Sequence, residues 1–135
     1  MALSSYYSRL VAEGVFSHNS DFSDPKKKTG KLSLETSTSN MCKAGEISLD
    51  TSDTITIYDA SVEQWTEVHF LLVKMASDAD GAVTFTDKGA TAHTVALTND
   101  DMIAVTSFTI TADITIAGTG GGGLVEYMLV GRRLA

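Results

Sequence analysis

The sequence has one cysteine and one proline in 135 residues, and it lacks a long apolar run. Because Cys42 has no second cysteine to pair with, an intrachain disulfide is excluded and an oxidised secreted scaffold is not expected. Residues 1–10 have no apolar core of the kind that a signal peptide has, and the longest apolar run, 70–73, is far shorter than the roughly 20 residues that span a membrane. We therefore expect a soluble chain that is made in a reducing cytoplasm and has no membrane partner.

Positive charge is also scarce. The chain has 10 Lys and Arg residues against 17 Asp and Glu residues, a formal net charge of -7. Nucleic-acid binding needs clustered Lys and Arg, so nucleic acid is not expected as a partner. Residues 1–45 carry a net charge of +2 and residues 46–135 carry -9. A mildly basic N-terminal part before an acidic remainder predicts two surfaces with different roles.

Residue combinations that support catalysis or bind metals are missing as well. Cys42 has no nearby histidine, and no nucleophile is paired with a base. Residues 118–123 match the glycine spacing of a dinucleotide-binding loop, but a strand-like segment follows where that site needs a helix, so a flexible loop is expected. Residues 78–81 resemble the start of a calcium-binding loop, but the ligands that such a loop has further along the chain are absent, so a turn is expected. The histidines, His18, His69 and His93, have no metal-ligand spacing. We expect no enzyme, no cofactor and no metal.

Residues 46–135 have the composition of a β domain. Thr, Val and Ile dominate, and these residues suit a pleated surface. Clusters of Asp, Asn and Gly separate the apolar segments, as turns do. About eight short strands in about 90 residues, with no helix-length segment between them, predict an all-β fold, a single β-sandwich of jelly-roll type. The expected strands are 47–49, 54–58, 66–76, 82–87, 92–98, 102–106, 108–117 and 124–131.

Two of these strands, within 68–75 and 124–130, are apolar on both faces. Most of the others alternate apolar residues with threonine, which indicates one buried and one wet face. A strand that is apolar on both faces must be covered twice, either by the N-terminal segment or by another subunit. We expect a homo-oligomer, with a trimer as the first hypothesis, that associates through Val125, Tyr127 and Leu129 or through the opposite face of that strand. A slip in the alternation near 106–107 predicts a bulge or a corner.

Residues 1–45 are predicted to form an extended arm in front of the domain at 46–135. The apolar spacing over 3–16 is close to a helical stripe and predicts a short helix. Residues 17–45 are polar, hold the single proline and show no apolar period, so an extended segment without its own core is expected. We expect the arm to bind a partner protein through its apolar anchors and its basic residues: Leu3, Tyr6, Tyr7, Arg9, Leu10, Lys26, Lys27, Lys28 and Lys31.

Four segments carry a family resemblance: the threonine-alternating strands 54–57 and 108–111, the glycine-rich hairpin 118–123 and the closing segment 125–133. In these segments the chain resembles small virion proteins of tailed bacteriophages, over residues 46–135. The resemblance implies a jelly-roll capsid decoration (cement) protein, commonly trimeric, that clamps neighbouring major capsid proteins from outside the virion.

The arm is longer and more polar than a minimal decoration domain requires, so a second interpretation stays open. The chain would then be a tail, fibre or spike module that binds a host surface glycan or a neighbouring tail protein. Exposed aromatic residues on the β loops would favour glycan binding, and Tyr58 and Trp65 are the candidates, although a single tryptophan at the start of a strand is more often a core residue.

Overall fold

The computed structural model describes residues 6–17, 20–21, 23, 26–76 and 78–133, and most of these residues lie in strands. Within this part of the chain there is one short helix, α1 (Ala60–Glu63). The strands are β1 (Tyr6–Phe16), β2 (Lys28–Ser39), β3 (Met41–Leu49), β4 (Thr54–Tyr58), β5 (Glu67–Ala76), β6 (Asp80–Thr86), β7 (Ala92–Leu97), β8 (Met102–Val105), β9 (Ile114–Gly120) and β10 (Gly123–Arg132).

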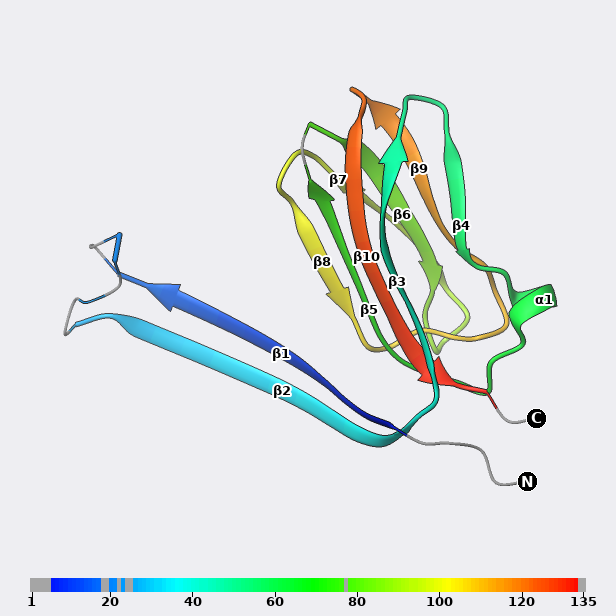
Figure 1. The fold of residues 1–135 in the computed structure, drawn as a ribbon, viewed down its shortest axis with the longest axis horizontal. Coiled ribbons are helices and arrows are strands. Elements are labelled where there is room, and N and C mark those ends of the chain that lie inside the picture. The colour runs from blue at the N-terminus through cyan, green and yellow to red at the C-terminus, as the bar shows by residue number, and fades with distance from the viewer. Residues whose placement is uncertain (1–5, 18–19, 22, 24–25, 77, 134–135) are drawn as a thin grey trace.

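In the described part of the chain all strand pairs are antiparallel, and they form three sheets. Two sheets have four strands, in the orders β3-β10-β5-β8 and β4-β9-β6-β7, and the third is the hairpin of β1 and β2. The two four-stranded sheets stack on each other, and the hairpin extends away from one end of them (Figure 1). This all-β arrangement is consistent with the β-sandwich that the strand pattern predicts.

The hydrophobic core lies between the two four-stranded sheets. It uses every second residue of the strands, so that Leu71, Val73 and Met75 of β5 are at most 1% exposed. From the other sheet, Val83, Ile114 and Ile116 face them and are equally buried. Because burying one such side chain stabilises the fold by about 1.5–3 kcal/mol, this layer fixes the register of both sheets.

The helix predicted over 3–16 is wrong in the part that the structure describes, because residues 6–16 form β1. Leu10 and Ala12 lie opposite Leu34 and Leu32, and Val11 lies opposite Ser33. Pairing with β2 satisfies the backbone groups that a helix would pair internally. The polar segment that was expected to lack structure of its own supplies this partner strand, and a contact between residues this far apart has no local signal in the sequence.

The strands expected at 54–58, 66–76, 82–87, 92–98, 102–106 and 124–131 are found within two residues of these bounds. β3 begins at Met41 instead of residue 47, because its first half also pairs with β10. β9 begins at Ile114 instead of residue 108. Residues 106–113 carry the chain from the sheet of β8 to the sheet of β9, which confirms the corner expected near 106–107.

The glycine-rich segment 118–123 contains a tight connection between the two sheets, and the hairpin expected there is wrong. β9 ends at Gly120, β10 begins at Gly123, and the two strands belong to different sheets. Gly121 has a φ of 65°, which suits glycine. A Cβ atom at Gly118 would lie 2.0 Å from the carbonyl oxygen of Asp50, so only glycine lets the two chain segments approach this closely.

The hydroxyl of Tyr58 ties the corner to the rest of the core. Tyr58 has no exposed surface; its hydroxyl donates a hydrogen bond to the carbonyl oxygen of Ile110 at 2.9 Å and accepts one from the backbone N–H of Trp65 at 3.2 Å. We predict that Tyr58→Phe lowers the free energy of unfolding by about 1–3 kcal/mol, because both buried partners lose a bond. Urea denaturation followed by circular dichroism measures the change. Tyr7→Phe, at a side chain that is 89% exposed, is the matched control, and equal losses in the two variants would contradict the assignment.

The contribution of the Tyr58 hydroxyl to stability should depend on pH. Burial raises the pKa of Tyr58 above its ordinary value of 10.0. The folded chain holds this proton more tightly than the unfolded chain does, so the contribution to stability is complete below pH 10 and is lost as the pH rises through the folded-state pKa. The difference in unfolding free energy between the wild type and Tyr58→Phe should therefore shrink in strongly alkaline solution. A difference that stays constant as the pH rises would show that the hydroxyl ionises freely in the folded chain.

Candidate functional site

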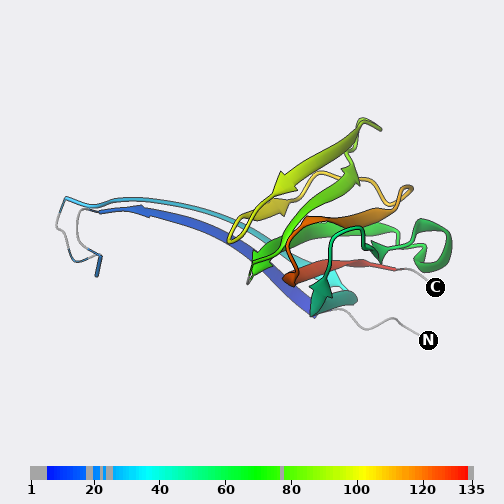
Figure 2. The same cartoon turned by 90° about the horizontal axis from the view of Figure 1, so that it is seen from above.

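The hairpin is the part of the described chain with the least support from the sandwich. β1 and β2 pair from Ser8 opposite Thr36 to Phe16 opposite Lys28. Figures 1 and 2 both show the hairpin leaving the sandwich near the start of β3 and diverging from the sheet that contains β10. A two-stranded ribbon is marginal in water unless a further strand or surface covers it, so the hairpin is the first candidate for a binding element.

A buried serine at the base of the hairpin links it to the sandwich. Ser39, the last residue of β2, is only 4% exposed. Its Oγ lies 2.8 Å from the Oγ of Ser8 and 2.7 Å from Nδ1 of His69. The other ring nitrogen of His69 lies 3.2 Å from a carboxylate oxygen of Glu67. This chain of polar contacts satisfies a hydroxyl that would otherwise be buried without a partner.

Asn40, between β2 and β3, adds a second set of bonds at the same place. Its backbone N–H donates to the carbonyl oxygen of Gly131 at 3.1 Å, and its side-chain amide both donates to Arg133 at 2.8 Å and accepts from it at 2.7 Å. Arg132 donates from Nη1 to the carbonyl oxygen of Thr38 at 2.7 Å. With these bonds the base of the hairpin is held at a fixed angle to β10.

The hairpin has two different faces. On the leucine face, defined here by Leu10, Ala12, Leu32 and Leu34, the pairs Leu10–Leu34 and Ala12–Leu32 stand opposite each other, and Leu32 is 77% exposed. On the charged face, Arg9 lies opposite Glu35, with an ion pair at 3.7 Å, and Glu13 lies opposite Lys31. An exposed pair of this kind contributes about 0–1 kcal/mol, so charge alone does not hold the ribbon together.

The sheet β3-β10-β5-β8 also has an apolar outer face, the side turned away from the core. Its central residues are Phe70 and Leu72 of β5 and Met128 and Val130 of β10, which pair as Phe70–Val130 and Leu72–Met128. Phe70 and Val130 are 2% exposed but lie outside the core cluster, because the base of the hairpin covers them. Leu72 and Met128 are only partly buried.

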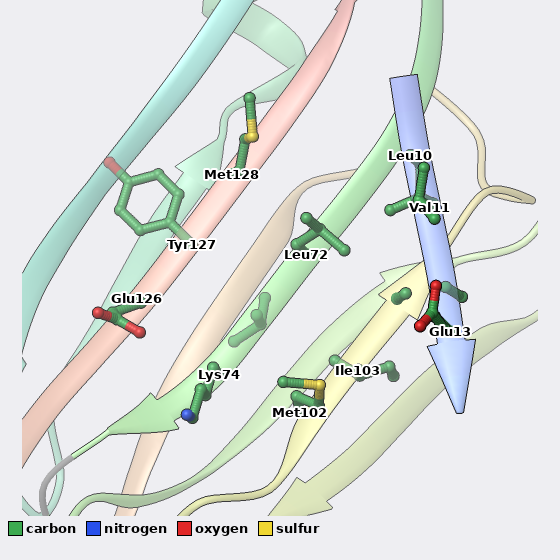
Figure 3. A pocket seen from close by; sticks show the side chains of 13 residues that line it. Leu10, Val11, Glu13, Leu72, Lys74, Met102, Ile103, Glu126, Tyr127 and Met128 are labelled. Atoms are coloured by element: carbon green, nitrogen blue, oxygen red, sulfur yellow. The ribbon is translucent and has the colours of Figure 1, made fainter. Parts of the chain in front are cut away.

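A groove separates the hairpin from the uncovered part of the outer face (Figure 3). Its volume is about 510 Å³; residues 10–13 of β1 form one wall, and residues of β5, β8 and β10 form the other. Figure 3 shows Leu10 and Val11 on β1 across from Leu72 on β5, with Lys74 and Glu126 nearer the far end. A second hollow of about 460 Å³ continues it toward the base of the hairpin.

The structure separates the residues predicted to bind a partner into two groups. Tyr6 and Tyr7 are 64% and 89% exposed at the base of the hairpin, beside Arg9. Lys26, Lys27, Lys28 and Lys31 are exposed at the opposite end. Leu10 is half-buried and lines the groove, and Leu3 lies outside the described residues. Tyrosines and lysines therefore cannot act as one patch.

Two of the three residues predicted for self-association are unavailable. Val125 and Leu129 are 0% exposed and belong to the core, and Tyr127 is half-buried against it. The alternation in the sequence shows that β10 has two apolar faces but does not say which one the second sheet covers. A subunit contact of β10 would therefore use the outer face, where Met128 is partly exposed and Val130 is 2% exposed.

The aromatic pair considered for glycan binding is buried. Tyr58 and Trp65 pack edge to face, with ring centroids 5.5 Å apart, and are 0% and 2% exposed. They are thus unable to stack on a sugar ring at the surface. Trp65 Nε1 is buried without a hydrogen-bond partner among the described atoms.

Asp87 of the 87–91 turn and His93 of β7 form a pair with a structural role. Nε2 of His93 lies 2.6 Å from a carboxylate oxygen of Asp87, and this hydrogen bond lowers the pKa of Asp87. The other carboxylate oxygen accepts from the N–H groups of Gly89 and Thr91. Within the described part of the chain, no cluster of His, Cys, Asp or Glu could hold a metal ion, and no helix is long and apolar enough to cross a membrane.

Sequence reasoning missed the residues that position the hairpin: Ser39, Asn40 and His69. Their partners lie 30 or more residues away in the chain, so their role appears only once the strands are paired. The one local signal is the polar Ser39-Asn40 step between β2 and β3. His69 also lies beside the irregularity in the pairing of β5 with β10, which no residue pattern indicates.

Replacing the buried Ser39 tests whether its contacts hold the hairpin against the sandwich. We predict that Ser39→Ala increases amide hydrogen exchange across β1 and β2, because His69 and Ser8 lose their shared partner at a cost of about 1–3 kcal/mol. Exchange in the two sandwich sheets should not change. Ser33→Ala, at an exposed position of the same strand, is the matched control. Equal exchange in both variants would show that the serine contacts do not hold the hairpin.

Comparisons with known proteins do not assign this chain to a family. No family model matches the sequence, and no curated protein matches it. The function is therefore argued from the hairpin, the outer face and the distribution of charge.

Proposed function

We propose that this chain is a structural virion protein of a tailed bacteriophage, a capsid decoration (cement) protein of jelly-roll type that uses its hairpin as an arm to clamp neighbouring major capsid proteins. It catalyses no reaction. The observation that carries the proposal is the hairpin itself: strands of 11 and 12 residues leave the sandwich with most of their side chains exposed. Such a ribbon gains its full stability only when a partner covers it.

The distribution of charge favours the hairpin over the sandwich as the contact. Residues 46–135 carry -9 and would be repelled by an acidic shell, whereas residues 1–45 carry +2. The exposed lysines at the far end steer and orient the chain, because each exposed ion pair is worth only about 0–1 kcal/mol. Tyr6 and Tyr7, with 64% and 89% of their surface free, supply the apolar area that holds the complex.

The alternative, a tail, fibre or spike module that binds glycan, has lost its support. Its candidate aromatics, Tyr58 and Trp65, are buried in the core. Binding to a neighbouring tail protein would use the same hairpin. Immunogold labelling of intact particles separates the two locations, because a decoration protein marks the head and a tail module marks the tail.

We predict different losses of affinity when the tyrosines or the lysines are replaced, measured on particles assembled without this protein. Replacing Tyr6 and Tyr7 by serine should weaken binding by about 100-fold, because about 1.5 kcal/mol or more of burial is lost at each position. Replacing Lys26, Lys27 and Lys28 by glutamine should weaken binding by about tenfold or less and reduce its dependence on salt. Co-sedimentation with particles at several salt concentrations measures both effects.

Matched controls lie on the sandwich. Val62→Ser removes an apolar side chain that is 68% exposed on α1, and Lys88→Gln removes an exposed charge in the 87–91 turn. Neither should change binding. If the double tyrosine variant still binds at full occupancy while Val62→Ser releases the protein, the sandwich is the anchor and the assignment is reversed.

A further inference from the structure

The outer faces of the two sandwich sheets differ in the polarity of their side chains. On the sheet β4-β9-β6-β7 the outward residues include Thr84, Thr94 and Thr115, with the hydroxyls of Thr84 and Thr94 3.1 Å apart. Hydroxyl groups of this kind suit a wet face. On the outer face of the sheet β3-β10-β5-β8, Leu72 pairs with Met128, and the next outward pair along the same strands is Lys74 with Glu126. The apolar part of this face, around Leu72 and Met128, is of the kind that a partner covers.

The hairpin of the same chain covers only part of this outer face. It buries Phe70 and Val130 near its base and then diverges, so that Leu72 and Met128 remain partly exposed and Met102 is 69% exposed. The leucine face of the hairpin is unmatched in the same way, since Leu32 and Leu34 are 77% and 41% exposed. The chain therefore carries two apolar surfaces, each without a complete partner.

The two surfaces of one chain cannot close on each other at low cost. Closure would swing the hairpin about the Ser39-Asn40 step, where Ser39 contacts His69 and Asn40 makes three hydrogen bonds to Gly131 and Arg133. Losing the contact of the buried Ser39 costs about 1–3 kcal/mol, and each of the more exposed Asn40 bonds adds about 0.5–1.5 kcal/mol. A hairpin from another molecule reaches the outer face without breaking any of them.

We propose that the hairpin of a second copy of this chain packs its leucine face on the outer face of the first, over Leu72, Met102 and Met128. Length fits, because strands of 11 and 12 residues can cross a sheet whose central strands have 10. Charge fits as well: residues 1–45 carry +2 and residues 46–135 carry -9, so hairpin on sandwich is attractive, whereas sandwich on sandwich is repulsive. The contact joins two different surfaces, and it closes into a ring when the rotation between copies permits.

This inference leaves the charged face, the tyrosines and the lysine end available for another protein. The proposed function and the association of copies therefore use separate parts of the hairpin, and each can fail without the other.

Light scattering on the purified full-length chain, from micromolar to tens of micromolar, tests the association without any particle. The wild type should be an oligomer. Leu72→Asp on the outer face and Leu32→Asp on the leucine face should each raise the dissociation constant by about 30-fold or more, because each places a carboxylate in the apolar contact. Thr84→Asp, at a half-buried position of the other outer face, should leave the mass unchanged.

Leu32→Asp keeps the test independent of folding, since that side chain is 77% exposed and circular dichroism checks the sandwich. A monomeric wild type at tens of micromolar overturns the proposal. An oligomer that survives Leu72→Asp overturns the outer face as the contact. An oligomer lost in Leu72→Asp but retained in Leu32→Asp overturns the hairpin as the occupant.

Discussion

Strand β10 imposes the main constraint on this structure, because it is central in its sheet and apolar on both sides. Val125 and Leu129 are sealed in the core, while Met128 and Val130 face outward. A single sandwich covers one side of such a strand. Val130 and Met128 both line the hollow at the base of the hairpin, but Val130 is 2% exposed whereas Met128 is only partly buried. The groove beside the hairpin and the proposed association with a second chain both follow from this incomplete cover.

The hairpin meets this constraint only in part because it has two faces with different chemistry. Residues 10–13 of β1 line the groove, so both faces of the hairpin border it: Leu10 and Ala12 from the leucine face, and Glu13 from the charged face. One ribbon can therefore contact a copy of its own chain with one side and a different protein with the other. The weak exposed ion pairs on the charged face set orientation, while buried apolar area sets affinity. An acidic sandwich that repels its own copies adds specificity to this arrangement.

Local patterns in the sequence predict most strands of the sandwich. Alternation such as Ile114 and Ile116 around Thr115, with Asp and Gly turns between segments, predicts strands and their inward faces. It fails where a distant partner decides the structure. β1 resembles a helix until β2 is opposite it, and Phe108 resembles strand although it lies in the corner between sheets. For the site, the basic and aromatic residues are predictable as a set, but their separation to opposite ends of the hairpin depends on pairing.

The buried base also changes the energetics expected for binding. A disordered segment loses about 1–2 kcal/mol of backbone entropy for each residue that it orders on a partner. In this chain much of that ordering precedes binding, because β1 and β2 are already paired and Ser39 and Asn40 fix their angle to β10. Apolar burial on a partner is then offset by little further loss of entropy. In the proposed function, a short ribbon with few strong anchors would hold a lattice together for this reason, provided that its base stays rigid.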